Sequence, residues 1–183
     1  MRKLILLTGI IVFYFSSYSQ EVKSITTTNV CRINLINPGI DYEVKVLQKS
    51  TLSINLGVGY GVSYKELTTS ASGWLYMYSP FLDLQLKHYY NLENRNKKGR
   101  SIEYNSGNFF GIRLLSRGKA FDSNFHRTSN YDFSIGPIWG SQRSYSRIHI
   151  LFDIGFNYYF DGKGNGGIIP MVEINIGYNL FSK

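Results

Sequence analysis

The sequence predicts an all-β protein, an eight-stranded antiparallel up-and-down transmembrane β-barrel. The first observation is residues 51–64, TLSINLGVGYGVSY, in which apolar or aromatic residues alternate with small or polar ones. Successive side chains of a strand point to opposite faces, so this pattern indicates a strand with one apolar and one polar face. The second is the length of this alternating segment. Strands of soluble proteins usually run about 5–6 residues and tilted membrane-crossing strands roughly 9–11, so a segment that covers 51–64 favours a membrane-crossing strand. The third is the absence of a helical pattern elsewhere.

The N-terminal residues have the layout of a secretory signal peptide. Arg2 and Lys3 precede an apolar run, Leu4–Phe15, which is followed by a small-residue site, Ser17-x-Ser19. The run is too short for a membrane-anchor helix, which needs roughly 20 residues. We therefore predict a signal peptide over residues 1–19, a flexible Thr-rich lead-in over 20–29 and the barrel over 30–183. Removing Arg2 and Lys3 lowers the formal charge from +8 to +6.

Eight segments of the remaining chain share the alternating pattern. They are Val30–Ile36, Ile40–Leu47, Thr51–Tyr64, Trp74–Leu92, Ser106–Arg117, Tyr131–Gly140, Arg147–Phe160 and Ile168–Phe181. Asn37-Pro38-Gly39 reads as a turn between the first two. If Pro38-Gly39 were instead a bulge inside one long strand, the count would be seven. Bacterial single-chain barrels have even strand numbers, which favours the turn.

The connections alternate in length, as they do in outer-membrane barrels. With both termini in the periplasm, Gln48–Ser50 and Gln142–Ser146 are short periplasmic turns. The longer external loops are Lys65–Gly73, Asp122–Asn130 and Asp161–Gly167. Glu93–Asn105 breaks the rule, because it is a long basic connection on the periplasmic side. The sequence predicts a mobile basic loop there and assigns it no role.

A soluble lipocalin-like barrel is the competing fold. Such a barrel turns its apolar face inward, and an eight-stranded interior has room only for tightly fitted side chains. Bulky residues such as Phe152, Phe156 and Tyr158 could not all fit inside, whereas Gly57 and Gly155 on the opposite face could. We therefore expect the apolar face to point outward into lipid.

The chain resembles the small outer-membrane β-barrel proteins, such as the OmpA transmembrane domain and the OmpX-like proteins. The resemblance is architectural and covers nearly all of the chain after the signal peptide. Its most specific part is Asn175-Ile-Gly-Tyr-Asn-Leu-Phe181, which is similar to the C-terminal signal read by the barrel-assembly machinery. The chain departs from that signal by continuing through Ser182 and Lys183. The resemblance implies insertion into the outer membrane and carries over no peptidoglycan-binding role.

Charged residues on the polar face are predicted to fill the barrel. By strand parity these are Asp41, Glu43, Lys45, Asp83, Lys87, Arg113, Arg117, Arg147, Asp153 and Glu173. Five acids and five bases suggest a paired network, because an unpaired charge in a narrow interior would be costly. The alternative is a conducting pore lined by the same residues.

The residue types that carry catalysis or bind metals form no convincing constellation. His88, His126 and His149 are scattered, so the sequence predicts no metal site and no cofactor. Asp122, Ser123 and His126 share a loop and hold the residue types of a membrane-surface lipid enzyme, which remains a minor alternative. The glycines of residues 162–167 lack a following helix to bind phosphate. Cys31 is alone, so no internal disulfide can form.

These features predict a structural or surface-interaction protein of the outer membrane, without catalysis and monomeric. Its partners are predicted to be outer-membrane lipids and lipopolysaccharide, and the barrel-assembly machinery during insertion. Four cations near the external loops could meet lipopolysaccharide phosphates: Lys65, Lys119, Arg127 and Lys163. The predicted export argues against nucleic acid as a partner. A small-solute channel is the alternative function, and the sequence names no specific ligand.

Overall fold

The computed structural model describes residues 25–64, 74–124 and 129–183. The predicted signal peptide, the predicted loop at 65–73 and His126 lie outside these residues. Strands dominate the described parts, and all strand pairs are antiparallel within one sheet. The strands are β1 (Val30–Asn34), β2 (Gly39–Leu47), β3 (Ser50–Tyr64), β4 (Trp74–Tyr89), β5 (Gly107–Arg117), β6 (Asp122–Ser123), β7 (Asp132–Tyr145), β8 (Ile148–Asp161) and β9 (Gly166–Ser182). The all-β prediction is confirmed at this level.

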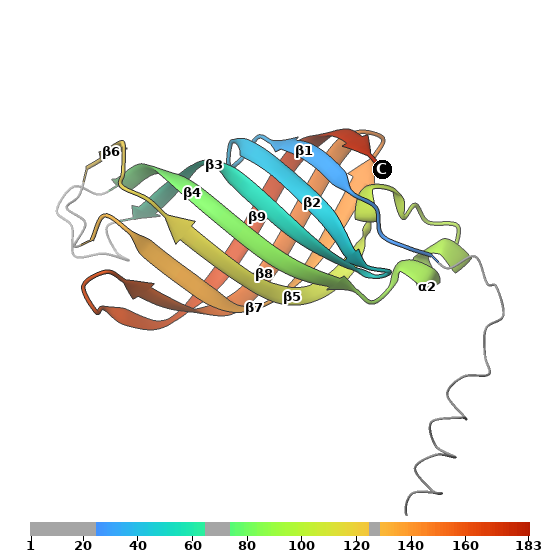
Figure 1. Ribbon diagram of the computed structural model, residues 1–183. Coiled ribbons are helices and arrows are strands. Elements are labelled where there is room, and N and C mark those ends of the chain that lie inside the picture. Colours follow the sequence, from blue (N-terminus) through green and yellow to red (C-terminus); the bar gives the residue numbers. More distant parts are fainter. Residues whose placement is uncertain (1–24, 65–73, 125–128) are drawn as a thin grey trace, which may run out of the picture.

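The sheet curves around a shared interior (Figure 1). Its strand order is β3-β2-β1-β9-β8-β7-β5-β4-β6, and β3 also pairs with β4 over its whole length. The first and last strands also pair, since β1 runs beside β9 from Asn34↔Gly177 to Val30↔Ser182. Each of the eight strands other than β6 therefore has a strand neighbour on both sides.

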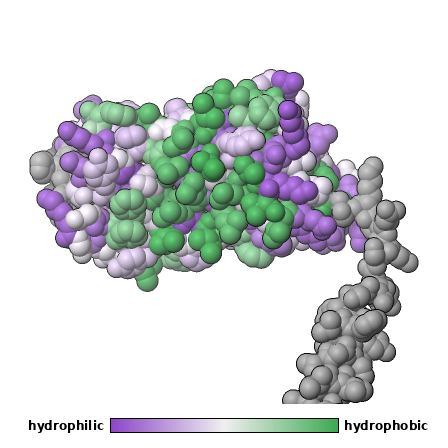
Figure 2. Space-filling model, in the orientation of Figure 1, coloured by the Kyte–Doolittle hydropathy of each residue, from purple (hydrophilic) through white to green (hydrophobic). Residues whose placement is uncertain are grey.

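The two faces of the sheet differ in polarity. Along β3, Thr51, Ser53 and Asn55 are buried, whereas Leu56 and Val58 are exposed. Strand β8 repeats the pattern with buried His149, Asp153 and Asn157 between exposed apolar residues. We call the buried face the inner face and the exposed face the outer face. Figure 2 shows the result as a hydrophobic surface between two hydrophilic ends.

The additional strand β6 and the end of β7 differ from the sequence-based expectation. The turn at residues 35–38 is present, so β1 and β2 are separate strands, but a two-residue strand, β6, is added beside β4. Strand β7 continues to Tyr145, so the predicted turn at Gln142–Ser146 shrinks to Ser146 and Arg147. Gln142 and Ser144 are buried on the inner face, and these polar residues obscured the end of the strand.

The expectation of no helix and of a loose basic loop at 93–105 was also wrong. The chain forms a short helix, α2 (Leu92–Lys97), and a 3₁₀ turn, η2 (Glu103–Asn105). Leu92 is buried in an apolar cluster with Tyr89, Phe109, Ile138 and Leu151, and Ile25 and Ile102 pack against it. One buried leucine and one isoleucine therefore anchor a segment whose other residues are mostly polar or charged. No helix in the described parts of the chain is long and apolar enough to span a membrane.

Candidate functional site

The inner face carries two clusters of buried charge, and the first is built on Arg32 of β1. Arg32 lies opposite Asp41 in the β1–β2 register, with Glu43 two residues further along β2. Its Nη1 is 2.9 Å from Asp41 Oδ2 and its Nη2 is 2.6 Å from Glu43 Oε2. Its Nε donates to Asn179 Oδ1 of β9 at 3.3 Å. One guanidinium therefore links β1 to both of its neighbours.

Glu43 is the centre of this Arg32 cluster and is fully buried. Besides Arg32, its carboxylate accepts hydrogen bonds from Thr51 Oγ1 at 2.6 Å, Tyr89 Oη at 2.7 Å and Gln142 Nε2 at 3.1 Å. Thr51 lies on β3, the strand next to β2, whereas Tyr89 of β4 and Gln142 of β7 come from strands that are not paired with β2. A carboxylate with both oxygens occupied in this way is suited to hold strands together rather than to move protons.

Lys87 and Gln142 extend the cluster toward α2 and η2. Lys87 Nζ donates to Gln142 Oε1 at 3.2 Å and lies 5.2 Å from the centre of the Phe109 ring, a cation–π distance. Gln142 Nε2 also donates to the main-chain oxygen of Tyr104 at 3.0 Å. The ring of Phe109 has room because position 140 is glycine, where a Cβ would lie 2.5 Å from Phe109 Cζ.

The second cluster surrounds Arg113 of β5. Arg113 binds both carboxylate oxygens of Asp83 at 2.8 Å, and it lies 2.9 Å from Glu173 and 3.4 Å from Asp153. Gln85 Nε2 donates to Asp83 at 3.0 Å and to Glu173 at 3.2 Å. Asp153 and Glu173 face each other directly across the β8–β9 register. Such like charges repel, and Arg113, which contacts both carboxylates, offsets their repulsion.

The structure places seven of the ten predicted interior charges in these clusters and leaves three outside them. The seven are Asp41, Glu43, Asp83, Lys87, Arg113, Asp153 and Glu173. Lys45 and Arg147 are exposed at the ends of β2 and β8, where alternation no longer points a side chain into the interior. Arg117 is half-buried beside a cavity of ≈ 40 Å³ that Arg113 and Glu173 also line.

Sequence reasoning missed Arg32, Tyr89, Gln85 and Gln142 as members of the clusters. Parity along β1 could have found Arg32, which alternates with outward Ile33. Parity along β4 likewise puts Tyr89 on the side of Gln85 and Lys87. Parity did not point to Gln142, because the sequence predicted a turn at Gln142–Ser146 and not a strand. With Arg32 included and the three outside residues removed, the two clusters hold five acids and three bases.

A segment at the α2 end of the sheet closes over the interior through Asn105. The fully buried side chain of Asn105 accepts from Thr28 N and donates to Thr28 O, both at 2.9 Å, as a neighbouring strand would. Tyr104 and Asn105 have positive φ values of 50° and 58°. Asparagine tolerates this left-handed region better than most residues.

Replacing Asn105 should loosen this end of the molecule. We expect Asn105→Ala to lower the free energy of unfolding by about 1–3 kcal/mol, because two half-buried main-chain groups of Thr28 lose their partner. Asn105→Gly should recover only the backbone part of the loss, since glycine accepts the positive φ but supplies no amide. Chemical unfolding would measure both, with exposed Asn94→Ala as the control. An Asn105→Ala protein as stable as the control would contradict this role.

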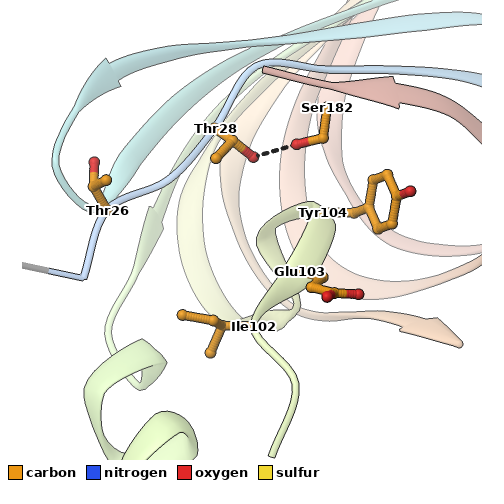
Figure 3. Close-up of a pocket in the computed structure, with 6 residues that line it drawn as sticks. All are labelled: Thr26, Thr28, Ile102, Glu103, Tyr104 and Ser182. Atoms are coloured by element: carbon orange, nitrogen blue, oxygen red, sulfur yellow. Dashed lines mark hydrogen bonds between the residues drawn. The ribbon is translucent and has the colours of Figure 1, made fainter. Parts of the chain in front are cut away.

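A cavity of ≈ 410 Å³ opens beside Asn105. It is lined by Thr26, Thr28, Ile102, Glu103, Tyr104 and Ser182. Figure 3 shows Thr28 and Ser182 joined by a hydrogen bond on one side, with the η2 residues on the other. Nearby, Lys49 Nζ lies 2.6 Å from Glu93 of α2, and this contact holds the pKa of the Glu93 carboxyl below its usual range. The lining holds hydroxyls and one carboxylate, with no nucleophile and base in contact.

A Ser–His pair occurs on the outer face. Ser50 Oγ lies 2.9 Å from His88 Nδ1, and the His88 ring packs on Phe110 with centroids 5.1 Å apart. The pair borders a largely apolar groove of ≈ 390 Å³ that includes Val46, Leu86 and Ile112. Nucleophilic catalysis would need a third group to orient the histidine. Within the described parts of the chain, no hydrogen bond or ion pair joins His88 to a carboxylate.

Of the residues singled out for other chemistry, Asp122 and Ser123 form β6, while their expected partner His126 lies outside the described residues. His149 is buried on the inner face. Among the described residues, no group of three or more His, Cys, Asp or Glu side chains is placed to hold a metal ion.

In comparisons with known proteins, no family model, no curated protein and no solved structure matches the chain.

Proposed function

We propose that the chain is an eight-stranded β-barrel of the outer membrane whose interior is filled by a charged plug, and that its role is structural or in surface interaction. The observation that carries the proposal is the opposite polarity of the two faces. Phe156 and Val172 are 67% and 66% exposed, whereas Glu43 and Asp153 are fully buried. In water this arrangement would be unfavourable, because apolar side chains would be solvated and charges desolvated. In a bilayer the first cost falls because lipid becomes the outer solvent, and the ion pairs of the interior offset the second.

The strand pairing supports the barrel. Only helices and closed barrels satisfy their backbone hydrogen bonds within hydrocarbon, because an open sheet edge leaves N–H and C=O groups unpaired. The β3–β4 and β1–β9 pairings remove the two edges that an open eight-stranded sheet would have. A soluble ligand-carrying barrel would need the reverse polarity, with an apolar interior.

The plug favours this role over that of a channel. The Arg32 and Arg113 clusters both reach across the interior, and η2 closes over the α2 end through Gln142 and Asn105. Eight strands leave a bore that side chains can fill. We therefore expect ions and small solutes to be excluded.

Planar-bilayer recording tests the plug. The wild-type protein should show no steady conductance, because the clusters occupy the bore. Glu43→Ala removes the acceptor of four hydrogen bonds and should produce conductance or large flickering openings. Glu103→Ala, an exposed carboxylate on η2, serves as the matched control and should stay silent. A large steady current through the wild type that Glu43→Ala leaves unchanged would make the protein a channel.

The proposed orientation places α2 and both termini in the periplasm and the β8–β9 loop outside. In a Cys31→Ser background, Lys163→Cys should react with a membrane-impermeant maleimide on intact cells, since Lys163 is exposed in that loop. Lys98→Cys, exposed just after α2, should react only after the outer membrane is permeabilised. Labelling of Lys98→Cys on intact cells would invert the orientation.

The proposed partners follow from this location. Lys119 and Lys163 are exposed at the end opposite α2, where they could meet lipopolysaccharide phosphates, whereas Lys65 and Arg127 lie outside the described residues. The C-terminal strand β9 would present Asn175–Phe181 to the barrel-assembly machinery. We propose a monomer without catalytic activity or cofactor, and no role in nucleic-acid binding.

A further inference from the structure

The end of the molecule that carries α2 is strongly basic (Figure 1). The exposed or half-buried cations at this end include Lys45, Lys49, Arg95, Lys97, Lys98, Arg100, Arg143 and Arg147. Among the described residues, the exposed acidic side chains there are Glu93 and Glu103, and Glu93 is already paired with Lys49. Most of this positive charge therefore has no carboxylate to balance it, in contrast to the arginines of the two interior clusters.

Three of these cations, Arg95, Arg100 and Arg143, lie together, and we call them the arginine cluster. Arg95 is on α2, and Arg100 donates its main-chain N–H to Arg95 O at 2.9 Å. Arg143 is on the outer face of β7, where its Nη2 donates to Asn108 Oδ1. Asn108 N donates in turn to the side chain of Asn91, the residue before α2, at 2.8 Å. These bonds bring Arg143 close enough to the other two arginines for their charges to repel.

Neutral oxygens hold two of the three guanidinium groups in place. Arg95 donates from Nε and Nη2 to the main-chain oxygen of Ser101, at 3.3 Å and 2.8 Å. Arg143 donates from Nη1 to the main-chain oxygen of Gln142 at 2.7 Å. Burial and the nearby Arg100 guanidinium lower the pKa of Arg95 from its usual value. Within the described parts of the chain, no ion pair joins the cluster to a carboxylate, so its charge and several N–H donors remain available to an anion.

Aromatic side chains mark the level of the arginine cluster on the outer face. Trp139 Nε1 donates to Tyr90 Oη at 3.0 Å, and the Tyr90 ring stacks on Phe110 with centroids 6.3 Å apart. Arg143 follows Trp139 by four residues on the same face of β7, and it lies opposite Ile150 of β8. Tryptophan and tyrosine gather at the membrane–water interface, at the level of the headgroups. The anion found at this level of a bilayer is the phosphate of a lipid headgroup.

We propose that the arginine cluster binds the phosphate of an anionic phospholipid in the leaflet on the α2 side of the membrane. The planar fork of donors in arginine matches phosphate oxygens, and three neighbouring arginines favour a headgroup with net negative charge over a zwitterionic one. The acyl chains of this lipid would lie along the outer face past Trp139. The inference rests on the membrane location proposed above, and it names the class of lipid that occupies one position on the protein.

Fluorescence quenching by brominated phospholipids tests the proposal in vesicles. Trp74→Phe leaves Trp139 as the only tryptophan of the chain. At about 3.3 Å per residue, Trp139 lies roughly 13 Å from Arg143 along β7, so brominated acyl chains of a lipid bound at the cluster would pass it. Dibrominated phosphatidylglycerol or phosphatidylcholine, each mixed with the other lipid unbrominated, gives their relative affinity at this position. Phosphatidylglycerol should be favoured at least about tenfold, because each cation near an anionic lipid contributes about five-fold.

Variants of this Trp139 protein locate the preference. Arg100→Gln should lower it about five-fold, and the fold should be unaffected because the Arg100 side chain has no hydrogen bond or ion pair within the described residues. Replacing all three arginines of the cluster by Gln should abolish it. The matched control combines Lys45→Gln, Lys97→Gln and Lys98→Gln, which removes three exposed cations from the same end. This control should keep most of the preference, since the arginine cluster is intact.

The outcomes separate this inference from the membrane location. Equal affinity for the two lipids, a preference that Arg100→Gln leaves unchanged, or an equal loss in the lysine control would overturn the inference alone. An excess of inorganic phosphate at constant ionic strength should not alter the preference, and its loss would assign the cluster to soluble phosphate instead of a lipid. If neither brominated lipid quenches Trp139, the membrane location fails, and the inference fails with it.

Discussion

Arg113→Leu should lower the free energy of unfolding by about 3–5 kcal/mol, the usual cost of removing one partner from a buried ion pair. The variant leaves Asp83, Asp153 and Glu173 buried together without a cation. Asp153 and Glu173 then repel each other across β8 and β9, because they are directly opposite in the register. Chemical unfolding of the refolded protein in lipid vesicles would measure the loss.

Two controls separate charge imbalance from loss of packing. Adding Asp83→Asn and Glu173→Gln to Arg113→Leu should restore most of the lost stability, since two of the three uncompensated charges disappear. Arg100→Leu removes an exposed guanidinium and should change stability by no more than about 0.5 kcal/mol. Equal stability of Arg113→Leu and the wild type would mean that the cluster does not hold the interior together.

Phe152→Arg should lower the free energy of unfolding by roughly 2–4 kcal/mol if the outer face lies in hydrocarbon, which is the cost of arginine at the bilayer midplane of outer-membrane barrels. Phe152 lies on the outer face near the middle of β8, opposite Ile174 of β9. Unfolding from lipid vesicles provides the measurement, and the same variant in detergent should lose less stability.

A second arginine substitution, at the end of the same strand, is the matched control for this prediction. Ile148→Arg makes the same kind of change on the same face, at the first residue of β8, next to Arg147. Near the interface arginine should cost only about 0–1 kcal/mol. Equal losses at Phe152 and Ile148 would contradict the proposed depth of the strand in the membrane.

Much of the fold could be predicted from alternation alone, because period two is a local property of the chain. From Leu52 onward in β3 and along all of β8, every second residue is apolar or aromatic, so the extent and the outer face of both strands followed from the sequence. The end of β7 could not be predicted, because Gln142 and Ser144 are inner-face residues in a stretch without a continuous apolar side. Helix α2 is too short for a helical period, and Leu92 alone anchors it.

The interior clusters were predictable in composition but not in pairing. Parity identified Glu43 and Asp83 as inner-face residues, since it depends only on position within a strand. Which acid meets which base depends on register and on contacts across the interior. Glu43 meets Arg32 of β1 and Gln142 of β7, and Arg113 of β5 meets Glu173 of β9. The contacts of Glu43 with Gln142 and of Arg113 with Glu173 join residues far apart in the chain, where a single sequence carries no signal.

The seam between β1 and β9 has a consequence for the order of folding. Most neighbouring strands are consecutive in the chain and can form as hairpins, whereas this seam joins the two ends through Thr28 with Ser182 and Asn29 with Lys183. Closing so long a loop costs entropy before any contact offsets it, so the seam should form late. Substitutions in β1 should then accelerate unfolding much more than they slow folding. The ring of strands would thus be completed only after both ends of the chain are available.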